Sequence, residues 1–213
     1  TDEASLPGGR CAMFSAGIIK GTSMKLLIIT QAVDQDNPVL GFFHRWIGEF
    51  AGKFKQVTVI CLEKGENNLP ENVKVLSLGK EVSKSRIKYL FNFYRYIWRE
   101  KKNYDAVFVH MNQEYILLGA GFWKLWGKKV TMWRNHHAGN WLTTLAVFLS
   151  DKVFCPSKYS FTAKFKNAVL MPVGIDLELF KLDNKIVRKP LSILFLSRMA
   201  PSKRPHLLIE ALA

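Results

Sequence analysis

Two basic residues near the end of the chain have a spacing that suits the binding of an anion. Arg198 follows the apolar run "ILFLS", and Lys203 precedes the apolar, helix-like run "HLLIEALA". If the first run is a strand and the second a helix, both cations can converge on an anion at the helix N-terminus, where free N–H groups and the helix dipole also favour negative charge. A diphosphate is such an anion. The alternative is two solvated residues on an ordinary charged loop.

Two adjacent histidines, His136 and His137, form a second candidate group in the segment "MWRNHHAGNW". A neutral imidazole at the end of a strand can share a hydrogen bond with a hydroxyl group and hold that group in position for attack. Adjacent loop residues are expected to point apart, so only one of the two would serve. The alternative is a capping or core-satisfied histidine pair. No metal site is expected, because the chain has no H-x-x-x-H or C-x-x-C spacing.

The elements that must position these residues alternate between strand-like and helix-like patterns from Met24 onward. Short β-branched runs predict strands at 25–30, 56–62, 73–78, 105–111, 128–133, 152–157 and 168–173. Longer runs predict helices at 39–54, 85–102, 114–127, 140–149 and 158–166. Because the strands are almost continuously apolar, both faces of their sheet should be covered. The sequence therefore predicts an α/β fold with a Rossmann-like, doubly wound parallel sheet, which binds ligands at the carboxyl ends of its strands.

The chain is predicted to divide into four segments. Residues 1–23 lack a sustained period and are expected to be a leader or a vector-derived extension. Residues 24–176 form the first Rossmann-like domain, and the charged, proline-bearing stretch 177–190 is a linker. Residues 191–213 then begin a second Rossmann-like domain with a strand at "ILFLS". That domain is expected to be truncated, because no further strands follow it.

Composition narrows the classes of partner. The chain has 31 Lys and Arg against 17 Asp and Glu, a formal net charge of +14, which favours an anionic substrate or surface. Three widely spaced cysteines, Cys11, Cys61 and Cys155, are interpreted as buried thiols in a reducing compartment. No apolar stretch reaches the roughly 18 residues of a membrane span. The protein is expected to be cytoplasmic, either free or attached to the inner face of the membrane.

The segment 85–102 is the best sequence clue to such an attachment. A helical apolar spacing joins six of its residues: Ile87, Leu90, Phe91, Tyr94, Ile97 and Trp98. Lys88, Arg95 and Arg99 fall on another face of the same helix. The simpler interpretation is that the apolar stripe docks on the sheet while the basic face is solvated. The second interpretation adds binding to anionic lipid, to which each basic residue would contribute about 1 kcal/mol.

Five motifs together resemble the family 4 retaining glycosyltransferases, which have the two-Rossmann GT-B fold. The motifs are "MKLLIIT", a loop with Arg and His after the fifth strand, "VFCPSKYS", "MPVGID" and "LFLSRMAPSKRPHLLIEALA". The last is the most specific, because the family typically reads G-R-x-x-x-x-K-G before a helix of the L-L-I-E-A kind. Here Ser197 and Arg204 replace the two glycines, while Arg198 and Lys203 keep their spacing.

The resemblance implies transfer of a sugar from a nucleotide-diphosphate donor to a glycan or lipid-linked acceptor, with retention at the anomeric carbon and without a metal or other cofactor. Arg198 and Lys203 would bind the donor diphosphate. A histidine after the fifth strand would contact the transferred sugar, and His136 matches that position better than His137. The family's later E-x-x-x-x-x-x-x-E donor element does not occur in the second domain before Ala213, so this chain should be nearly inactive by itself.

Gly41 stands where the family commonly has a glycine pair that lets the backbone approach the donor. An equal alternative is that Asn37 and Pro38 start the helix and Gly41 permits close packing of helix on sheet. Two other functions stay open at this point. A sugar-nucleotide epimerase on the same fold would need an acid/base pair. A nucleic-acid binder would need exposed aromatic residues among the basic ones, and is not expected because most aromatics have helix-core spacing.

Overall fold

The computed structural model describes residues 23–171, 173–174, 181, 190–197 and 201–212. They fall into two compact units, of which the first ends at Val173 and the second begins at Gly174. Each unit is described by itself. The predictions made for the leader up to residue 22, for Cys11 and for Arg198 lie outside the described residues.

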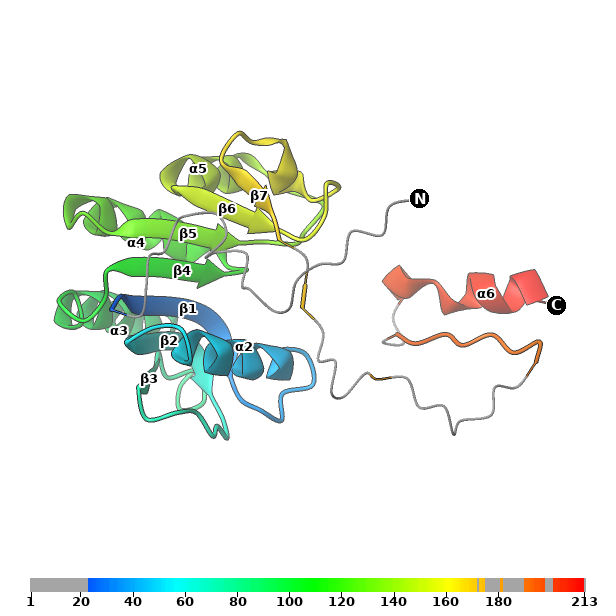
Figure 1. Cartoon of the computed structure of the whole chain (residues 1–213), viewed down its shortest axis with the longest axis horizontal. Coiled ribbons are helices and arrows are strands. Elements are labelled where there is room, and N and C mark those ends of the chain that lie inside the picture. Colours follow the sequence, from blue (N-terminus) through cyan, green and yellow to red (C-terminus); the bar gives the residue numbers. More distant parts are fainter. Residues whose placement is uncertain (1–22, 172, 175–180, 182–189, 198–200, 213) are drawn as a thin grey trace. The chain divides into compact units, whose positions relative to one another are not determined.

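Seven strands form the sheet of the first unit, and every neighbouring pair is parallel. They are β1 (Lys25–Val33), β2 (Gln56–Lys64), β3 (Val73–Ser77), β4 (Ala106–His110), β5 (Lys129–Trp133), β6 (Lys152–Cys155) and β7 (Ala168–Leu170). The order β3-β2-β1-β4-β5-β6-β7 reverses between β1 and β4 (Figure 1). Such sheets bind ligands at the carboxyl ends of the strands, near a reversal. All seven strands and the doubly wound class were predicted and are confirmed.

Helices cover both faces of the sheet (Figure 1). They are α2 (Gly41–Ala51), α3 (Arg86–Arg99), α4 (Gln113–Leu125) and α5 (Trp141–Leu149). Residues of α2 join one buried cluster with Leu26 and Ile28 of β1. Residues of α3, α4 and α5 join the other cluster with Leu27 and Ile29. Because successive strand residues point to opposite faces, the continuous apolar run of β1 serves both cores.

Two expected elements differ from the structure. The helix predicted over 158–166 is a single 3-10 turn, Phe161–Lys164, because the chain must already enter β7 at Ala168. The strand predicted at "ILFLS" is not formed: residues 192–196 carry no strand, and Leu194 and Leu196 are 85% and 84% exposed. A parallel strand needs a neighbour to pair with. The described part of the second unit otherwise holds a 3-10 turn, Pro201–Lys203, and helix α6 (Pro205–Leu212).

The buried face of α3 also differs from the predicted apolar stripe. The helix buries Phe93 and Ile97 against the sheet. Ile87, Phe91 and Trp98 are instead 81%, 67% and 55% exposed. The helix carries apolar residues on two adjacent sides, and contact with the sheet selects only one of them. The simpler interpretation of residues 85–102 thus holds in part: α3 docks on the sheet and its basic residues are exposed, but part of the predicted apolar stripe is exposed as well.

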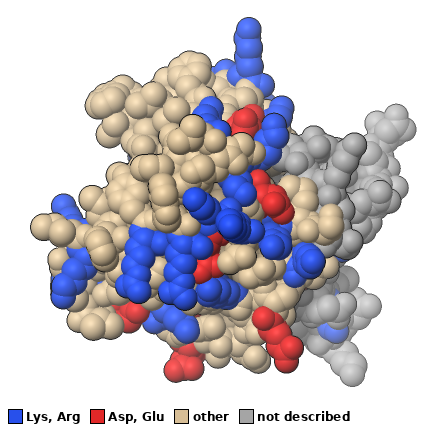
Figure 2. Space-filling model, turned by 90° about the vertical axis from the view of Figure 1, so that its left-hand side faces the viewer, with Lys and Arg blue, Asp and Glu red and all other residues tan. Residues whose placement is uncertain are grey.

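Basic side chains gather at the end of the first unit where the strands begin (Figure 2). Lysines stand at or directly before the starts of four strands: Lys25, Lys55, Lys129 and Lys152. The amino ends of parallel strands meet at one edge of a sheet, so these residues share it. The basic end thus lies opposite the edge at which a doubly wound sheet binds ligands.

Candidate functional site

A hollow of about 350 Å³ lies where β5 leads into α5. Seven residues line this β5–α5 hollow: Gln113, Arg134, His136, Ala138, Gly139, Asn140 and Thr143. They come from the loop after β5 and from the first turns of α4 and α5, all of which follow carboxyl ends of strands. Its size is within the range of small-molecule sites. The hollow therefore satisfies the expectation for the position of a ligand site in this fold.

His136, the preferred histidine of the sequence analysis, is exposed and lines the hollow. Its Nδ1 lies 3.1 Å from the Ala138 backbone nitrogen and 3.2 Å from the Ala138 carbonyl oxygen. When Nδ1 accepts from the Ala138 N–H, the proton of the neutral imidazole is on Nε2, which can then donate to a ligand. The rings of His136 and His137 are stacked, with centroids 4.8 Å apart. The expectation that the two histidines point apart is therefore wrong.

Arg134 also lines the hollow, and the sequence analysis did not select it. Its backbone N–H donates to Phe154 O at 2.9 Å, which extends the β5–β6 pairing by one residue. Its Nη1 donates to the His136 carbonyl oxygen at 3.4 Å. Burial lowers the pKa of the guanidinium, which is half-buried, and the nearby Glu114 opposes this shift. Among the described residues, no carboxylate forms an ion pair with Arg134.

The far side of the hollow is the first turn of α5. Asn140 and Thr143 form a capping box, in which Asn140 Oδ1 accepts from Thr143 N at 3.0 Å and Thr143 Oγ1 accepts from Asn140 N at 3.2 Å. Thr143 Oγ1 also donates to Gln113 Oε1 at 2.8 Å, which ties α5 to α4. A Cβ on Gly139 would collide with the ring of Phe161. The loop is thus fixed by local contacts that need these residue types.

His110 ends β4 and is a buried histidine that sequence reasoning missed. Its ring stacks on Phe43 with a centroid distance of 3.7 Å and on Trp133 with one of 5.3 Å. Its Nδ1 shares a hydrogen bond of 3.1 Å with Thr30 Oγ1. Burial lowers the pKa of His110 to about 3, so the ring is neutral at physiological pH. The only signal in the sequence was a polar residue inside an apolar strand run.

Gly41 is explained by the packing of its own loop. A Cβ at this position would lie 2.8 Å from the backbone oxygen of Gln35. Asn37 Oδ1 accepts from the N–H groups of Val39 and Leu40, at 3.0 and 2.8 Å, so Asn37 starts the turn that leads into α2. These contacts account for the glycine without a ligand. Donor binding by Gly41 stays a prediction.

The second unit places Lys203 at the end of its 3-10 turn, where the residue is exposed. The next residue, Arg204, has φ +49°, in the left-handed region that glycine adopts most easily. Arg204 is the residue that replaces the second family glycine, so the backbone keeps a glycine-like turn although the side chain differs. The roles predicted for Arg198 and Lys203 stay predictions, and so do those for Lys88, Arg95 and Arg99, which are exposed on α3.

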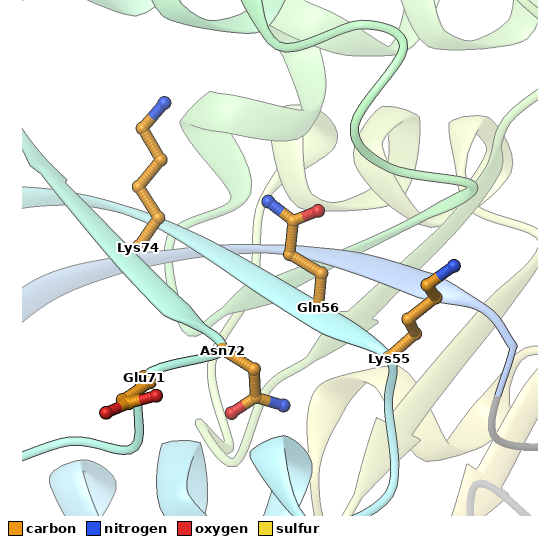
Figure 3. Close-up of a pocket in the computed structure, with 5 residues that line it drawn as sticks. All are labelled: Lys55, Gln56, Glu71, Asn72 and Lys74. Carbon is orange, nitrogen blue, oxygen red and sulfur yellow. The ribbon is translucent and has the colours of Figure 1, made fainter.

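A second hollow, of about 250 Å³, lies at the basic end of the sheet. Its lining side chains diverge rather than meet at one point (Figure 3). Asn72 Nδ2 donates to Ala51 O and Phe54 O at 2.9 and 3.1 Å, and Lys74 pairs with Glu100 at 2.7 Å. These groups are occupied in holding α2 and α3 to the strands. The second hollow is therefore a structural feature and the β5–α5 hollow is the better candidate.

Neither a metal centre nor a membrane span is found in the described part of the chain. No three His, Cys, Asp or Glu residues there are grouped so that they could hold a metal ion. None of the helices described there is long and apolar enough to cross a bilayer. Cys61 and Cys155 are free and buried, as predicted.

Comparison with known proteins supports the fold. No protein-family model and no curated protein matches the chain. The crystal structure of HepE from Anabaena in complex with UDP matches with a TM-score of 0.50 and 16% identity, over 76% of this chain and 47% of HepE. The lipopolysaccharide outer core galactosyltransferase WaaB matches with a TM-score of 0.46 and 13% identity, over 72% of this chain and 47% of WaaB. The chain thus spans about half the length of these proteins. At such identities the similarity concerns the fold alone.

Proposed function

We propose that this chain supplies the acceptor-side domain of a retaining glycosyltransferase, which moves a sugar from a nucleotide-diphosphate donor to a glycan or lipid-linked acceptor. The observation that carries the proposal is the β5–α5 hollow, a ligand-sized site at the carboxyl edge of a doubly wound sheet that contains His136. The glycine-like turn at Arg204 supports the resemblance of the second unit to the donor-binding segment of the family.

In the proposed reaction the protein acts by positioning and electrostatics. His136 shares a hydrogen bond with a sugar hydroxyl and fixes the orientation of the transferred sugar. As the bond to the donor diphosphate breaks, negative charge grows on the departing group. Arg198 and Lys203 stabilise that charge more in the transition state than in the ground state. The mechanism uses no metal or other cofactor.

A chain that carries a complete second Rossmann-like domain provides the test. We expect it to transfer sugar, while the 213-residue chain alone does so little or not at all. Lys203→Ala in the longer chain should lower kcat/KM by ~10²-fold or more, and His136→Ala should lower it as well. Arg204→Gly is the matched control, because it removes a neighbouring cation but keeps the left-handed turn. Transfer that is indifferent to the loss of Arg198 and Lys203 together would defeat the proposal, and inversion at the anomeric carbon would defeat its retaining part.

A sugar-nucleotide epimerase on the same fold is the runner-up. It would need an acid/base pair at the sugar, and the lining of the β5–α5 hollow has one imidazole and no carboxylate. This composition favours transfer. Conversion of a nucleotide sugar to its epimer in the absence of acceptor would reverse the preference.

We also propose that α3 docks the protein on the anionic, cytoplasmic face of a membrane. Its exposed apolar side, Ile87, Phe91 and Trp98, lies beside the exposed Lys88, Arg95 and Arg99. Aromatic contacts continue the patch onto α4: Trp98 lies 6.4 Å from Phe122 and 5.4 Å from Trp126, measured between ring centroids. Lys101 Nζ is 4.7 Å from the centroid of the Trp98 ring. Exposed aromatics among cations suit the headgroup region of a bilayer.

Vesicle sedimentation tests this docking. The triple change Lys88, Arg95 and Arg99 to Gln should weaken binding to vesicles of phosphatidylglycerol and phosphatidylcholine by about 10²-fold, because each cation contributes about 1 kcal/mol. Added salt should weaken it too. Changing Lys25, Lys55 and Lys152 to Gln is the matched control, since these cations lie at the strand starts. Equal binding to purely phosphatidylcholine vesicles would leave α3 with a packing role alone.

A further inference from the structure

The β5–α5 hollow offers hydrogen-bond donors and positive charge, with no carboxylate in its lining. Arg134 contributes a guanidinium that, among the described residues, donates to the carbonyl oxygen of His136 alone, at 3.4 Å. A cation or a metal ion would find no anionic ligand there. The chemistry of the lining therefore favours an anionic ligand.

The two side-chain amides of the hollow are turned so that their donors stay available. Gln113 Oε1 accepts from the Thr143 hydroxyl, and Asn140 Oδ1 accepts from Thr143 N. Each oxygen is engaged by Thr143, and the NH₂ groups of Gln113 and Asn140 donate to no group in the described part of the chain. The network thus orients both amides as donors.

The first turn of α5 does not explain this arrangement by itself. Its capping box already uses the N–H groups of Asn140 and Thr143. Arg134 adds a full positive charge to the lining of the hollow. A half-buried guanidinium without an ion-paired carboxylate among the described residues is unfavourable for folding, since the charge of Glu114 offsets its desolvation only in part. An anion in the hollow would offset it.

We propose that Arg134, with the amides of Gln113 and Asn140, forms a seat for a phosphoryl group. The fork of a guanidinium matches two phosphate oxygens, and the two amides complete the shell. This inference rests on the proposed function, within which the phosphoryl group comes either from the donor diphosphate or from a phosphorylated acceptor. In both cases the seat fixes a phosphate beside His136.

The test uses the 213-residue chain and three probes: inorganic pyrophosphate, glycerol 3-phosphate and UDP. Binding is followed by NMR through the Arg134 Nε–H and the His136 ring resonances, and by calorimetry. Arg134→Gln should weaken binding at least 10-fold, and Arg134→Lys should weaken it less, because charge remains but the fork is lost. Arg86→Gln, at the exposed start of α3, is the matched control and should bind as the unchanged chain does. Urea unfolding verifies that each variant is folded.

The probes separate the two sources. If UDP binds in an Arg134-dependent way and glycerol 3-phosphate does not bind, the seat belongs to the donor. If glycerol 3-phosphate binds and UDP does not, the seat belongs to a phosphorylated acceptor. Binding of all probes unchanged by Arg134→Gln, or no binding at all, overturns the seat. The outcome is separate from that of the proposed function: a complete enzyme that transfers sugar equally well with Arg134→Gln would retain the function and lose the seat. Arg134-dependent binding without any transfer would do the opposite.

Discussion

Replacement of His110 tests whether its ring, which is 1% exposed, is shielded from protons in the folded protein. The ring packs between Phe43 and Trp133, and Trp133 directly precedes Arg134. In the folded state the pKa of His110 is lowered to about 3, whereas the unfolded chain has the ordinary value of about 6.5. Between these values the unfolded state binds the extra proton. Stability contributed by the neutral ring is therefore complete above pH 6.5 and is lost as pH falls below it.

The expected magnitude follows from this linkage. Between pH 7 and pH 5, protonation of His110 in the unfolded state should lower the free energy of unfolding by about 2 kcal/mol, or Tm by about 4 to 8 °C for a domain of this size. Urea unfolding followed by tryptophan fluorescence measures it. In His110→Phe this part of the pH dependence should vanish, while the loss of the Thr30 hydrogen bond costs about 1 kcal/mol at both pH values.

His110→Asn is a second non-titrating variant that can still bond to Thr30, and it should show the same flat response between pH 7 and pH 5. Carboxylates such as Glu100 contribute equally to all three proteins, so the difference between them isolates His110. If the unchanged protein and His110→Phe lose the same free energy over this range, His110 is accessible to protons in the folded state. That result would refute the conclusion that His110 stays neutral in the folded protein because it is buried.

Three further perturbations have defined outcomes. Gly41→Ala should lower the free energy of unfolding by about 1 to 3 kcal/mol, because the new Cβ would meet Gln35 O at 2.8 Å; urea titration measures this. Lys74→Met should lower the free energy of unfolding by about 1 to 3 kcal/mol above pH 5, because it removes the partner of Glu100, whose side chain is 2% exposed. The double variant Lys74→Met, Glu100→Gln should regain part of this free energy in the same urea titration. Cys61 should resist thiol reagents at pH 8, as burial raises its pKa to about 12; rapid labelling without unfolding would contradict this.

The sheet could be predicted because each of its strands is marked by a pattern of neighbouring residues in the sequence. Each strand is a short β-branched apolar run, and continuous runs such as that of β1 imply two covered faces. The exposed side of α3 could not be predicted in the same way. Its apolar residues occupy two neighbouring sides of the helix, and the choice of Phe93 and Ile97 as the docked pair depends on where β2 and α4 lie. The strand expected at "ILFLS" failed for a related reason, because strand formation depends on a partner strand.

The candidate site was predicted in part. His136 lies in a hollow at the carboxyl edge, as its place after the fifth strand implied. Arg134 was passed over because a single arginine beside two histidines carries no periodic signal. Its significance comes from its partial burial and from the absence of an ion-paired carboxylate among the described residues, which depend on the three-dimensional fold. His110 was missed because its five ring and hydrogen-bond partners come from β1, α2 and β5.

The basic residues that the proposals use fall into two groups, one exposed to solvent and one half-buried. On α3, the cations Lys88, Arg95 and Arg99 are exposed and repeated, so their attraction for a surface is additive and is screened by salt. At the β5–α5 hollow a single half-buried cation, Arg134, stands among oriented neutral donors, where a lower local dielectric strengthens its attraction for one anion. None of the three α3 cations lines the β5–α5 hollow, so the proposed docking of α3 on an anionic surface would leave the hollow's own residues available to a phosphorylated substrate.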